Sequence, residues 1–188
     1  KHLRHVMDAY RIDHYDFRGT YAAESTHDLS WKTRIIELGQ ICDIEVIQRW
    51  LHVRKSYKSL VNNAQNTHDI SVSRDPRDTY ILQALHTRPQ STWDAMAAWV
   101  QSGHAYLCLA WNAAGICDGA VYIYTHKGTE YYGHAATRSN DINHALIWKA
   151  IQKSTSQRFD MGWQGHATSE KGRDIEFFRR GFGGTDQP

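Results

Sequence analysis

Residues that favour β-strands fill three consecutive stretches in the second half of the chain, 105–111, 116–125 and 129–137. The short segments between these stretches contain glycine, at Gly115 and Gly128, as tight turns between strands commonly do. Consecutive strands joined by such short turns pair in an antiparallel manner. The pattern therefore predicts a three-stranded antiparallel meander.

Apolar residues recur at helical spacing on both sides of this meander. Between Ser91 and Gly103 they follow the i, i+3, i+4, i+7 pattern of a helix with one face in the core. We expect a capping box of Ser91 and Asp94 to begin this helix and Gly103 to end it. Further helices are expected at about 43–63, with Asp43 as N-cap, and at about 76–86, 143–154 and 173–180, and short strands at 34–38, 70–72 and 158–162.

The expected order from about residue 68 onward is strand, helix, helix, three antiparallel strands, helix, strand and helix. This order predicts a mixed α/β (α+β) fold, in which a largely antiparallel central sheet carries helices on both faces. We assign residues 67–188 to this domain and residues 1–66 to an N-terminal extension of strand and helix.

The composition limits the class of protein. Of the 188 residues, 41% are hydrophobic and 22% are charged, which indicates a folded globular chain. The longest apolar stretch, residues 105–111, is far shorter than the ~20 residues of a membrane helix, so we expect no integral membrane segment. The three cysteines form no Cys-x-x-Cys pair, which favours a reducing, cytoplasmic location. The formal net charge of +2 excludes a histone-like polycation.

Six segments of the sequence resemble a known family of enzymes. They are residues 54–62 (RKSYKSLVN), 87–94 (TRPQSTWD), 131–134 (YYGH), 144–150 (HALIWKA), 159–162 (FDMG) and 178–184 (FRRGFGG). In order and spacing these segments are similar to the FemAB/FemX-like branch of the GNAT acyltransferase superfamily, the peptidoglycan-bridge peptidyltransferases. The resemblance implies a GNAT-like fold and aminoacyl-tRNA-dependent transfer of an amino acid to an amine of a peptidoglycan precursor or another peptide.

The same resemblance implies the partners. An aminoacyl-tRNA would be the donor, and a peptide or peptidoglycan precursor would be the acceptor. Members of this branch usually carry two GNAT-like repeats, whereas a chain of 188 residues has room for one. We therefore expect either a further repeat upstream of Lys1 or a second copy of the chain in a homo-oligomer.

The resemblance implies that Phe178 and Arg179 correspond to the aromatic–basic pair that holds the 3′ end of the donor tRNA. An aromatic ring can stack on a base, and the neighbouring guanidinium can neutralise a phosphate or a developing oxyanion. We expect Arg179 to be catalytic in this sense and Arg180 to add positive charge for donor binding. The alternative is that Phe178 packs in the core while both arginines are solvated.

A second basic group lies on the long helix expected before residue 63. Arg54, Lys55 and Lys58 share one side of it, since Arg54 and Lys58 are four positions apart. This side would suit a tRNA backbone or a pyrophosphate-bearing acceptor; the alternative is a solvated helix face.

His144, at the start of the helix at 143–154, lies where N–H groups favour an anionic ligand, and the alternative is an ordinary first-turn residue.

Two residues of the expected sheet are candidates for proton transfer. His134 lies in the third strand of the meander and Asp160 in the strand that follows, beside the place where GNAT-like sheets part. Aminolysis of an ester requires the attacking amine to lose a proton, which an imidazole or a carboxylate can accept. We expect His134 and Asp160 to be catalytic in this way. The alternative is a structural role for each.

No cofactor is expected. The sequence contains neither His-Glu-x-x-His nor a paired cysteine set, so no metal site is predicted. The turn at residues 138–144 has no glycine, which disfavours close approach of its backbone to the pyrophosphate of acetyl-CoA. Alternative functions are an N-acyltransferase that uses another acyl-thioester donor and a non-catalytic GNAT-like binding module.

Overall fold

The computed structural model describes residues 33–37, 49–85, 88–163 and 170–187. Its strands form one seven-stranded sheet in the order β2-β3-β4-β5-β6-β1-β7. The strands are β1 (Thr33–Glu37), β2 (His68–Ser73), β3 (Ala105–Asn112), β4 (Cys117–His126), β5 (Thr129–Thr137), β6 (Arg158–Trp163) and β7 (Thr185–Gln187). The labelled helices are α3 (Lys55–Thr67), the short 3₁₀ helix η1 (Pro76–Asp78), α4 (Thr79–Leu85), α5 (Gln90–Gln101), α6 (Asn140–Lys153) and α7 (Glu170–Arg180).

The predicted meander is confirmed as β3, β4 and β5, which pair in an antiparallel manner. Lys127 and Gly128 close the turn between β4 and β5 with positive φ angles of 46° and 75°. No heavy atom lies within 4 Å of the position that a Cβ at Gly128 would take. The backbone conformation, rather than a lack of space, therefore favours glycine there.

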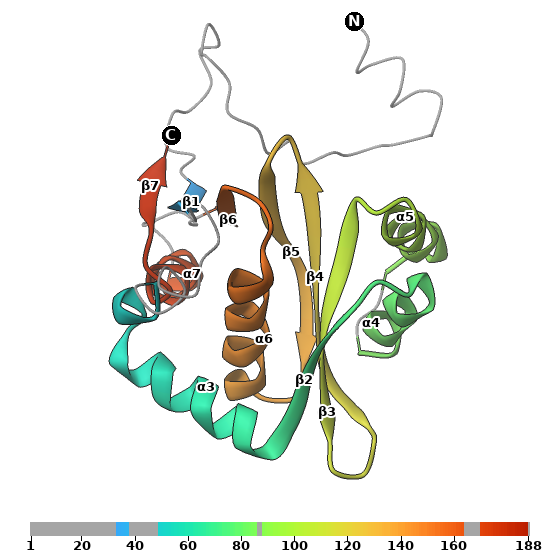
Figure 1. The fold of residues 1–188 in the computed structure, drawn as a ribbon, viewed down its shortest axis with the longest axis horizontal. Coiled ribbons are helices and arrows are strands. Elements are labelled where there is room, and N and C mark those ends of the chain that lie inside the picture. The colour runs from blue at the N-terminus through green and yellow to red at the C-terminus, as the bar shows by residue number, and fades with distance from the viewer. Residues whose placement is uncertain (1–32, 38–48, 86–87, 164–169, 188) are drawn as a thin grey trace, which may run out of the picture.

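Helices cover both faces of the sheet, as predicted: α3 and α6 lie on one face, and α4 and α5 lie on the other (Figure 1). Val61 and Leu146 belong to the core of the first face, and Trp93 and Leu107 to the core of the second. Six consecutive residues of β3, 105–110, are buried. Burial on both faces explains the uninterrupted apolar run of this strand. The mixed α/β fold with a largely antiparallel sheet is thus confirmed.

The capping box expected at the start of α5 is wrong. The helix begins at Gln90, and its N-cap is Pro89, which makes no side-chain capping hydrogen bond. Ser91 therefore lies inside the helix, two positions after the N-cap. Asp94 instead accepts hydrogen bonds from the hydroxyl of Tyr80 and the amide of Gln90.

The helix expected at about 43–63 is interrupted and extends further. Residues 49–52 are helical, residues 53 and 54 are not, and α3 continues to Thr67. The Arg54 backbone N–H donates to the Gly181 carbonyl at 2.8 Å, which is a bond to the far end of the chain. This long-range contact accompanies the break. The expected N-cap, Asp43, lies outside the described residues.

Two elements of the expected N-terminal extension pack against the rest of the chain. β1 lies in the sheet between β6 and β7 and pairs with both in an antiparallel manner. α3 contacts α6, where the Asn63 side chain donates to Asp141 at 2.8 Å. Strand β7 was not predicted from the sequence, and it completes the edge of the sheet beside β1.

Strands β5 and β6 part along their length. They pair in parallel over Thr129–Tyr131 and residues 158–160. Beyond this short pairing β5 runs to Thr137 and β6 to Trp163 without further pairing between them. Since α6 begins at Asn140, soon after β5 ends, its first turn lies beside the parted strands (Figure 1).

Candidate active site

The candidate site is built where β5, the start of α6 and the end of α7 come together. An aromatic cluster joins α3, α6 and α7 at this place. The ring centroids of Tyr57 and His144 are 4.1 Å apart, those of His144 and Phe178 are 5.1 Å apart, and those of Tyr57 and Phe182 are 5.2 Å apart. Phe178 is half-buried and packs against the core of the α3–α6 face. The cluster therefore fixes the end of α7 over the start of α6.

His144 has one ring nitrogen engaged and the other available within the described residues. Its Nδ1 lies 2.5 Å from the Asn140 carbonyl, which can only accept, so Nδ1 carries the proton. Its Nε2 is buried and has no hydrogen-bond partner there. Burial lowers the pKa of His144 and outweighs the carbonyl contact, which acts in the opposite direction. A neutral imidazole with an unprotonated Nε2 is a proton acceptor.

Three polar groups meet beside this cluster. Burial raises the pKa of the Tyr132 phenol, while a hydrogen bond from the Asn143 side chain and the charge of Arg179 act to lower it. The Asn143 Oδ1 is also buried and has no hydrogen-bond partner among the described residues. The Tyr132 phenol is thus influenced both by the amide of Asn143, in the first turn of α6, and by the positive charge of Arg179, near the end of α7.

The first turn of α6 already holds a negative charge. The Asp141 carboxylate accepts a hydrogen bond from Ile142 N at 3.1 Å, from Asn63 at 2.8 Å and from the Ser139 hydroxyl. The Ser139 hydrogen bond, together with the other contacts, lowers the pKa of Asp141. A carboxylate that occupies a helix N-terminus repels a further anion there.

The predicted basic residues of α3 surround its first turn beside α7. The Arg54 guanidinium lies 3.7 Å from the centroid of the Phe177 ring, a cation–π contact between the two elements. The Lys58 ammonium donates to the Leu51 carbonyl at 3.4 Å, and Lys55 is exposed. Arg54, Lys55 and Lys58 therefore lie near the start of α3, close to the end of α7.

The two neighbouring arginines at the end of α7, Arg179 and Arg180, differ in their burial. Arg180 forms ion pairs of 2.7 Å with both Glu176 and Asp186, so its charge is balanced locally. Arg179 is half-buried, and its charge acts to lower the pKa of Tyr132. The two neighbouring cations thus have different surroundings.

His134 and Asp160 lie on the opposite face of the sheet. The His134 ring is 6.0 Å from Trp93, a core residue of the α4–α5 face, and its Nδ1 is 3.4 Å from Arg88 Nη2. Asp160 is buried, and its carboxylate accepts from Gly162 N at 2.6 Å. The structure therefore brings together Phe178, Arg179, His144 and Arg54, and it places His134 and Asp160 across the sheet from them.

Sequence reasoning did not select Tyr57, Tyr132 or Asn143 for the site. Tyr132 belongs to a segment quoted for the resemblance, and strand alternation places it on the opposite face from Tyr131. The sequence does not indicate which of those faces meets α7. Tyr57 likewise contacts the site through Phe178 and His144, which are far from it in sequence.

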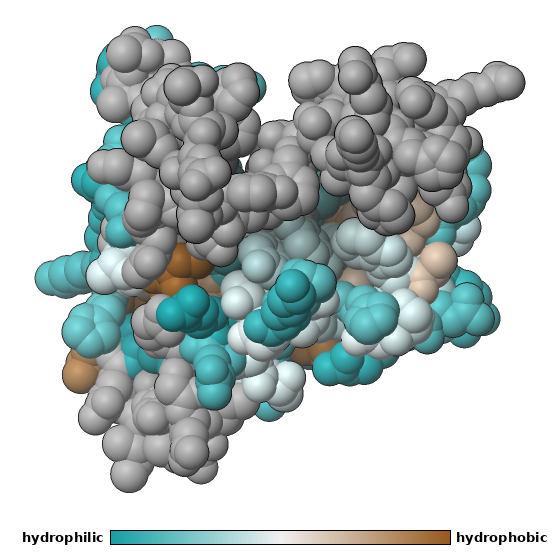
Figure 2. Space-filling model, turned by 90° about the horizontal axis from the view of Figure 1, so that it is seen from above, coloured by the Kyte–Doolittle hydropathy of each residue, from teal (hydrophilic) through white to brown (hydrophobic). Residues whose placement is uncertain are grey.

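The described surface around these elements is largely polar. Seen from above, it is mostly hydrophilic, and apolar side chains occupy small separate areas (Figure 2). No cluster of metal-ligating side chains occurs in residues 33–37, 49–85, 88–163 and 170–187. Within the same ranges, no helix combines the length and the apolar character needed to cross a bilayer.

Comparison with solved structures shows that the fold of this chain is similar to that of FemX. FemX itself matches at 11% identity and a TM-score of 0.64, over 83% of this chain and 59% of that one. L-PGS from Bacillus licheniformis matches at 10% identity and a TM-score of 0.52, over 83% of this chain and 58% of that one. The C-terminal domain of a protein described as a lysylphosphatidylglycerol synthetase, from Agrobacterium fabrum, matches at 8% identity and a TM-score of 0.58, over 85% and 58%.

These matches confirm the predicted fold, and at such identities the likeness is one of fold. The chain spans slightly less than three fifths of the length of each of these structures. No protein-family model and no curated protein sequence matches the chain.

Proposed function

We propose that this chain is the transferring part of an aminoacyl-tRNA-dependent acyltransferase, which joins an amino acid to an amine of a peptidoglycan precursor or another peptide. The observation that carries the proposal is that the rings of His144 and Phe178, with centroids 5.1 Å apart, join the start of α6 to the end of α7, where Arg179 is half-buried. The FemX-like fold supports it, as does the resemblance of residues 178–184 to the FemX-like branch.

The proposed reaction is direct aminolysis. The acceptor nitrogen attacks the ester carbonyl of the aminoacyl-tRNA, and negative charge develops on the carbonyl oxygen. Arg179, with the Asn143 amide, would stabilise that charge, since fixed donors in a partly enclosed site act more strongly than in water. The bond from the carbonyl carbon to the tRNA 3′ oxygen then breaks, and that oxygen leaves as a hydroxyl. No covalent enzyme intermediate is required.

The attacking amine must also lose a proton. In this proposal His144 Nε2 accepts the proton and returns it to the leaving 3′ oxygen, because it is on the same side of the sheet as Arg179 and has an acceptor lone pair. His134 and Asp160 are the candidates from the other face. Three conservative variants distinguish these candidates: His144→Gln, His134→Gln and Asp160→Asn. We expect only His144→Gln to lose the increase in transfer rate that occurs as the pH rises and the general base loses its proton.

The donor in this proposal is aminoacyl-tRNA rather than an acyl-CoA. The Asp141 carboxylate occupies the α6 N-terminus, where a CoA pyrophosphate would otherwise find N–H donors. Arg54, Lys55, Lys58 and the Phe178–Arg180 segment would contact the tRNA backbone and its 3′ end. We place the reaction in the cytoplasm, with no resident cofactor or metal, and with a further repeat or a second copy of the chain completing the enzyme.

Mass spectrometry of reaction products tests the proposal. The protein is incubated with a mixture of charged tRNAs and cell-wall precursors, and in parallel with acyl-thioesters and the same acceptors. An acceptor heavier by one aminoacyl residue, formed only with charged tRNA, is expected. Turnover with thioesters alone would indicate an N-acyltransferase that uses an acyl-thioester donor. Binding of tRNA or peptide without any product would indicate a non-catalytic binding module. Either result contradicts the proposal.

A further inference from the structure

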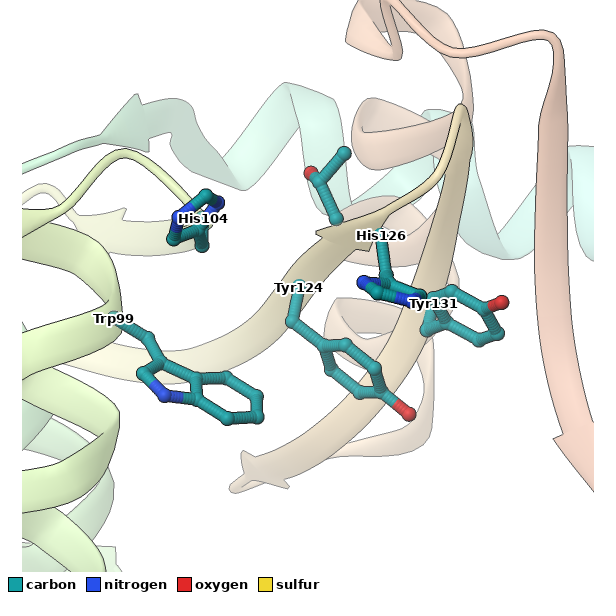
Figure 3. Close-up of a pocket in the computed structure, with 6 residues that line it drawn as sticks. Trp99, His104, Tyr124, His126 and Tyr131 are labelled. Carbon is teal, nitrogen blue, oxygen red and sulfur yellow. The ribbon is translucent and has the colours of Figure 1, made fainter. Parts of the chain in front are cut away.

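A pocket of about 350 Å³ lies at the end of the β4–β5 hairpin, beside the C-terminal end of α5. Trp99 points from α5 toward Tyr124 on the sheet, while His104 and His126 lie along the border (Figure 3). The residues that line it are Trp99, His104, Tyr124, Thr125, His126 and Tyr131. This volume lies within the range of small-molecule sites, ~300–1,000 Å³.

Backbone hydrogen bonds hold the walls of this aromatic pocket in place. The Trp99 carbonyl accepts from His104 N at 2.9 Å, and the His104 carbonyl accepts from Thr125 N at 2.7 Å. The end of α5 is thereby joined to the end of β4. Gly103, with a φ of 76°, provides the left-handed residue of the connection. The pocket is therefore formed before any ligand enters.

The rings are arranged for stacking. Tyr124 and Tyr131 are neighbours across β4 and β5, and their rings are nearly parallel, with centroids 4.9 Å apart and an interplanar angle of 6°. The Trp99 ring lies 5.9 Å from Tyr124 at 59°, and 51% of the Trp99 residue surface is exposed. A half-exposed tryptophan is unusual on α5, whose other tryptophan, Trp93, is fully buried. A planar ring that enters here would contact aromatic faces already in position.

The edges of the pocket offer hydrogen bonds. Within the described part of the chain, neither the Trp99 indole N–H nor the ring nitrogens of the exposed His104 and His126 contact a hydrogen-bond partner. An indole N–H is a donor, and each imidazole offers one donor and one acceptor. Stacking faces with such edges match the flat surface and the polar rim of a nucleobase.

Basic residues stand beside the pocket. Lys127 directly follows His126 in the hairpin turn and is exposed, and Arg158 on β6 is the parallel partner of Thr129. No acidic side chain lines the pocket. The Asp160 carboxylate lies on β6 opposite Tyr131, so the positive charge that could attract the phosphate of a nucleotide is on the side of Lys127.

We propose that this aromatic pocket binds an unpaired nucleobase, stacked against Trp99 and the Tyr124–Tyr131 pair, with its phosphate toward Lys127. The pocket lies on the α5 side of the sheet, across from Arg179, so the proposal does not rest on the transfer reaction. The base could belong to a free nucleotide or to a single-stranded segment of RNA. Its recognition by stacking would be tolerant of sequence.

Binding measurements with the purified chain test this proposal. Fluorescence anisotropy with labelled hexauridine and hexaadenosine follows the strand, and calorimetry with UMP and AMP follows the free nucleotide. Binding of the oligonucleotides, of the mononucleotides, or of both is expected, and the comparison identifies the source of the base. Stacking is worth about 1–3 kcal/mol per base, so Trp99→Ala is expected to weaken binding by about 5-fold to 150-fold. Trp99→Phe, which keeps an aromatic face, should retain most of the affinity.

Two control variants make the test specific. Ile116→Ala removes another exposed apolar side chain, 52% exposed, at the opposite end of the β3–β4–β5 meander, and it should leave the affinity unchanged. Arg138→Ala, which removes an exposed cation just after β5 at that same far end of the meander, should also leave the affinity unchanged. The proposal is overturned if neither kind of nucleotide binds, if Trp99→Ala binds as tightly as the unmodified chain, or if a neutral oligosaccharide such as chitotriose binds more tightly than the nucleotides.

Discussion

The Tyr57 hydroxyl donates a hydrogen bond of 3.1 Å to the Phe178 carbonyl and so joins two residues that are 121 positions apart. A second bond, from Arg54 N to the Gly181 carbonyl, ties the start of α3 to the end of α7 at 2.8 Å. The residue of greatest catalytic interest, Arg179, lies between these two anchored carbonyls in the sequence. The position of its guanidinium therefore depends on α3 as much as on its own helix.

Gly181→Ala is expected to break this junction. A Cβ at Gly181 would lie 2.0 Å from the Tyr57 Cε2 atom, so the buried Tyr57 ring would have to move. Overpacking of this kind costs about 3 kcal/mol. Gly128→Ala is the matched control: its φ is 75° and its Cβ position is open, so only the backbone cost of about 1 kcal/mol is expected. Urea unfolding compares the two variants, and equal losses would show that the predicted clash is absorbed elsewhere.

Tyr106→Phe is expected to destabilise the core beneath α6. The Tyr106 hydroxyl donates to Glu130 at 2.5 Å, and Glu130, which is 2% exposed, also accepts from Thr155 N at 3.1 Å. Loss of one donor leaves a buried carboxylate less satisfied, at a cost of about 1–3 kcal/mol. Tyr80→Phe removes a similar hydroxyl–carboxylate bond at the surface and should change the urea midpoint little. Similar losses in the two variants would contradict the role given to Glu130.

His144 should make stability depend on pH below about 6.5. Burial lowers the pKa of His144 from 6.5 in the folded chain, so the unfolded chain binds the proton first as the pH falls. Stability is therefore fully present above pH 6.5 and is lost as the pH falls through that value toward the folded pKa, by at most about 1.4 kcal/mol per pH unit.

The His144→Gln variant tests this dependence. Its unfolding free energy should fall less between pH 7 and pH 5 than that of the unmodified chain, because the buried imidazole is gone. His52→Gln, at an exposed position, should follow the unmodified chain. Identical slopes for all three proteins would mean that His144 is protonated as easily in the folded state as in the unfolded one.

Lys55→Ala is expected to reduce the salt dependence of tRNA binding. Lys55 is exposed at the start of α3, beside Arg54 and Lys58. Loss of one phosphate contact should lower the slope of log Kd against log salt by about 1. Lys153→Ala, an exposed lysine at the end of α6, is the control and should leave the slope unchanged. If tRNA binding were insensitive to salt, or if tRNA did not bind, this basic group would be a solvated helix face.

Much of the fold could be predicted because its signals are local. The meander depends on strand-forming runs and on turns such as the one at Gly128, all within a few residues of one another. Strand β7 could not be predicted, since three residues become a strand only by pairing with distant β1. The break before Lys55 likewise involves a bond to Gly181 at the other end of the chain. The capping box failed for a local reason, because the helix begins two residues earlier than expected, with Pro89 rather than Ser91 as its N-cap.

The site was predicted only in part, for a related physical reason. Arg179, Phe178 and His144 came from the resemblance and the helix start, and the structure brings them together. Tyr132 was missed because strand alternation gives two faces without indicating which one meets α7. The same ambiguity applies to His134 and Asp160, whose strands were predicted but whose side chains lie on the α4–α5 face.

The rate of aminoacyl transfer by Arg179→Ala, measured with charged tRNA and an amine acceptor, tests the central claim most directly. Removal of a cation that stabilises the developing oxyanion should reduce the rate by about 10²-fold or more, while the melting temperature stays within a few degrees. Lys171→Ala, an exposed cation on the same helix, should transfer at the unmodified rate. A folded Arg179→Ala protein with full transfer activity would contradict the account.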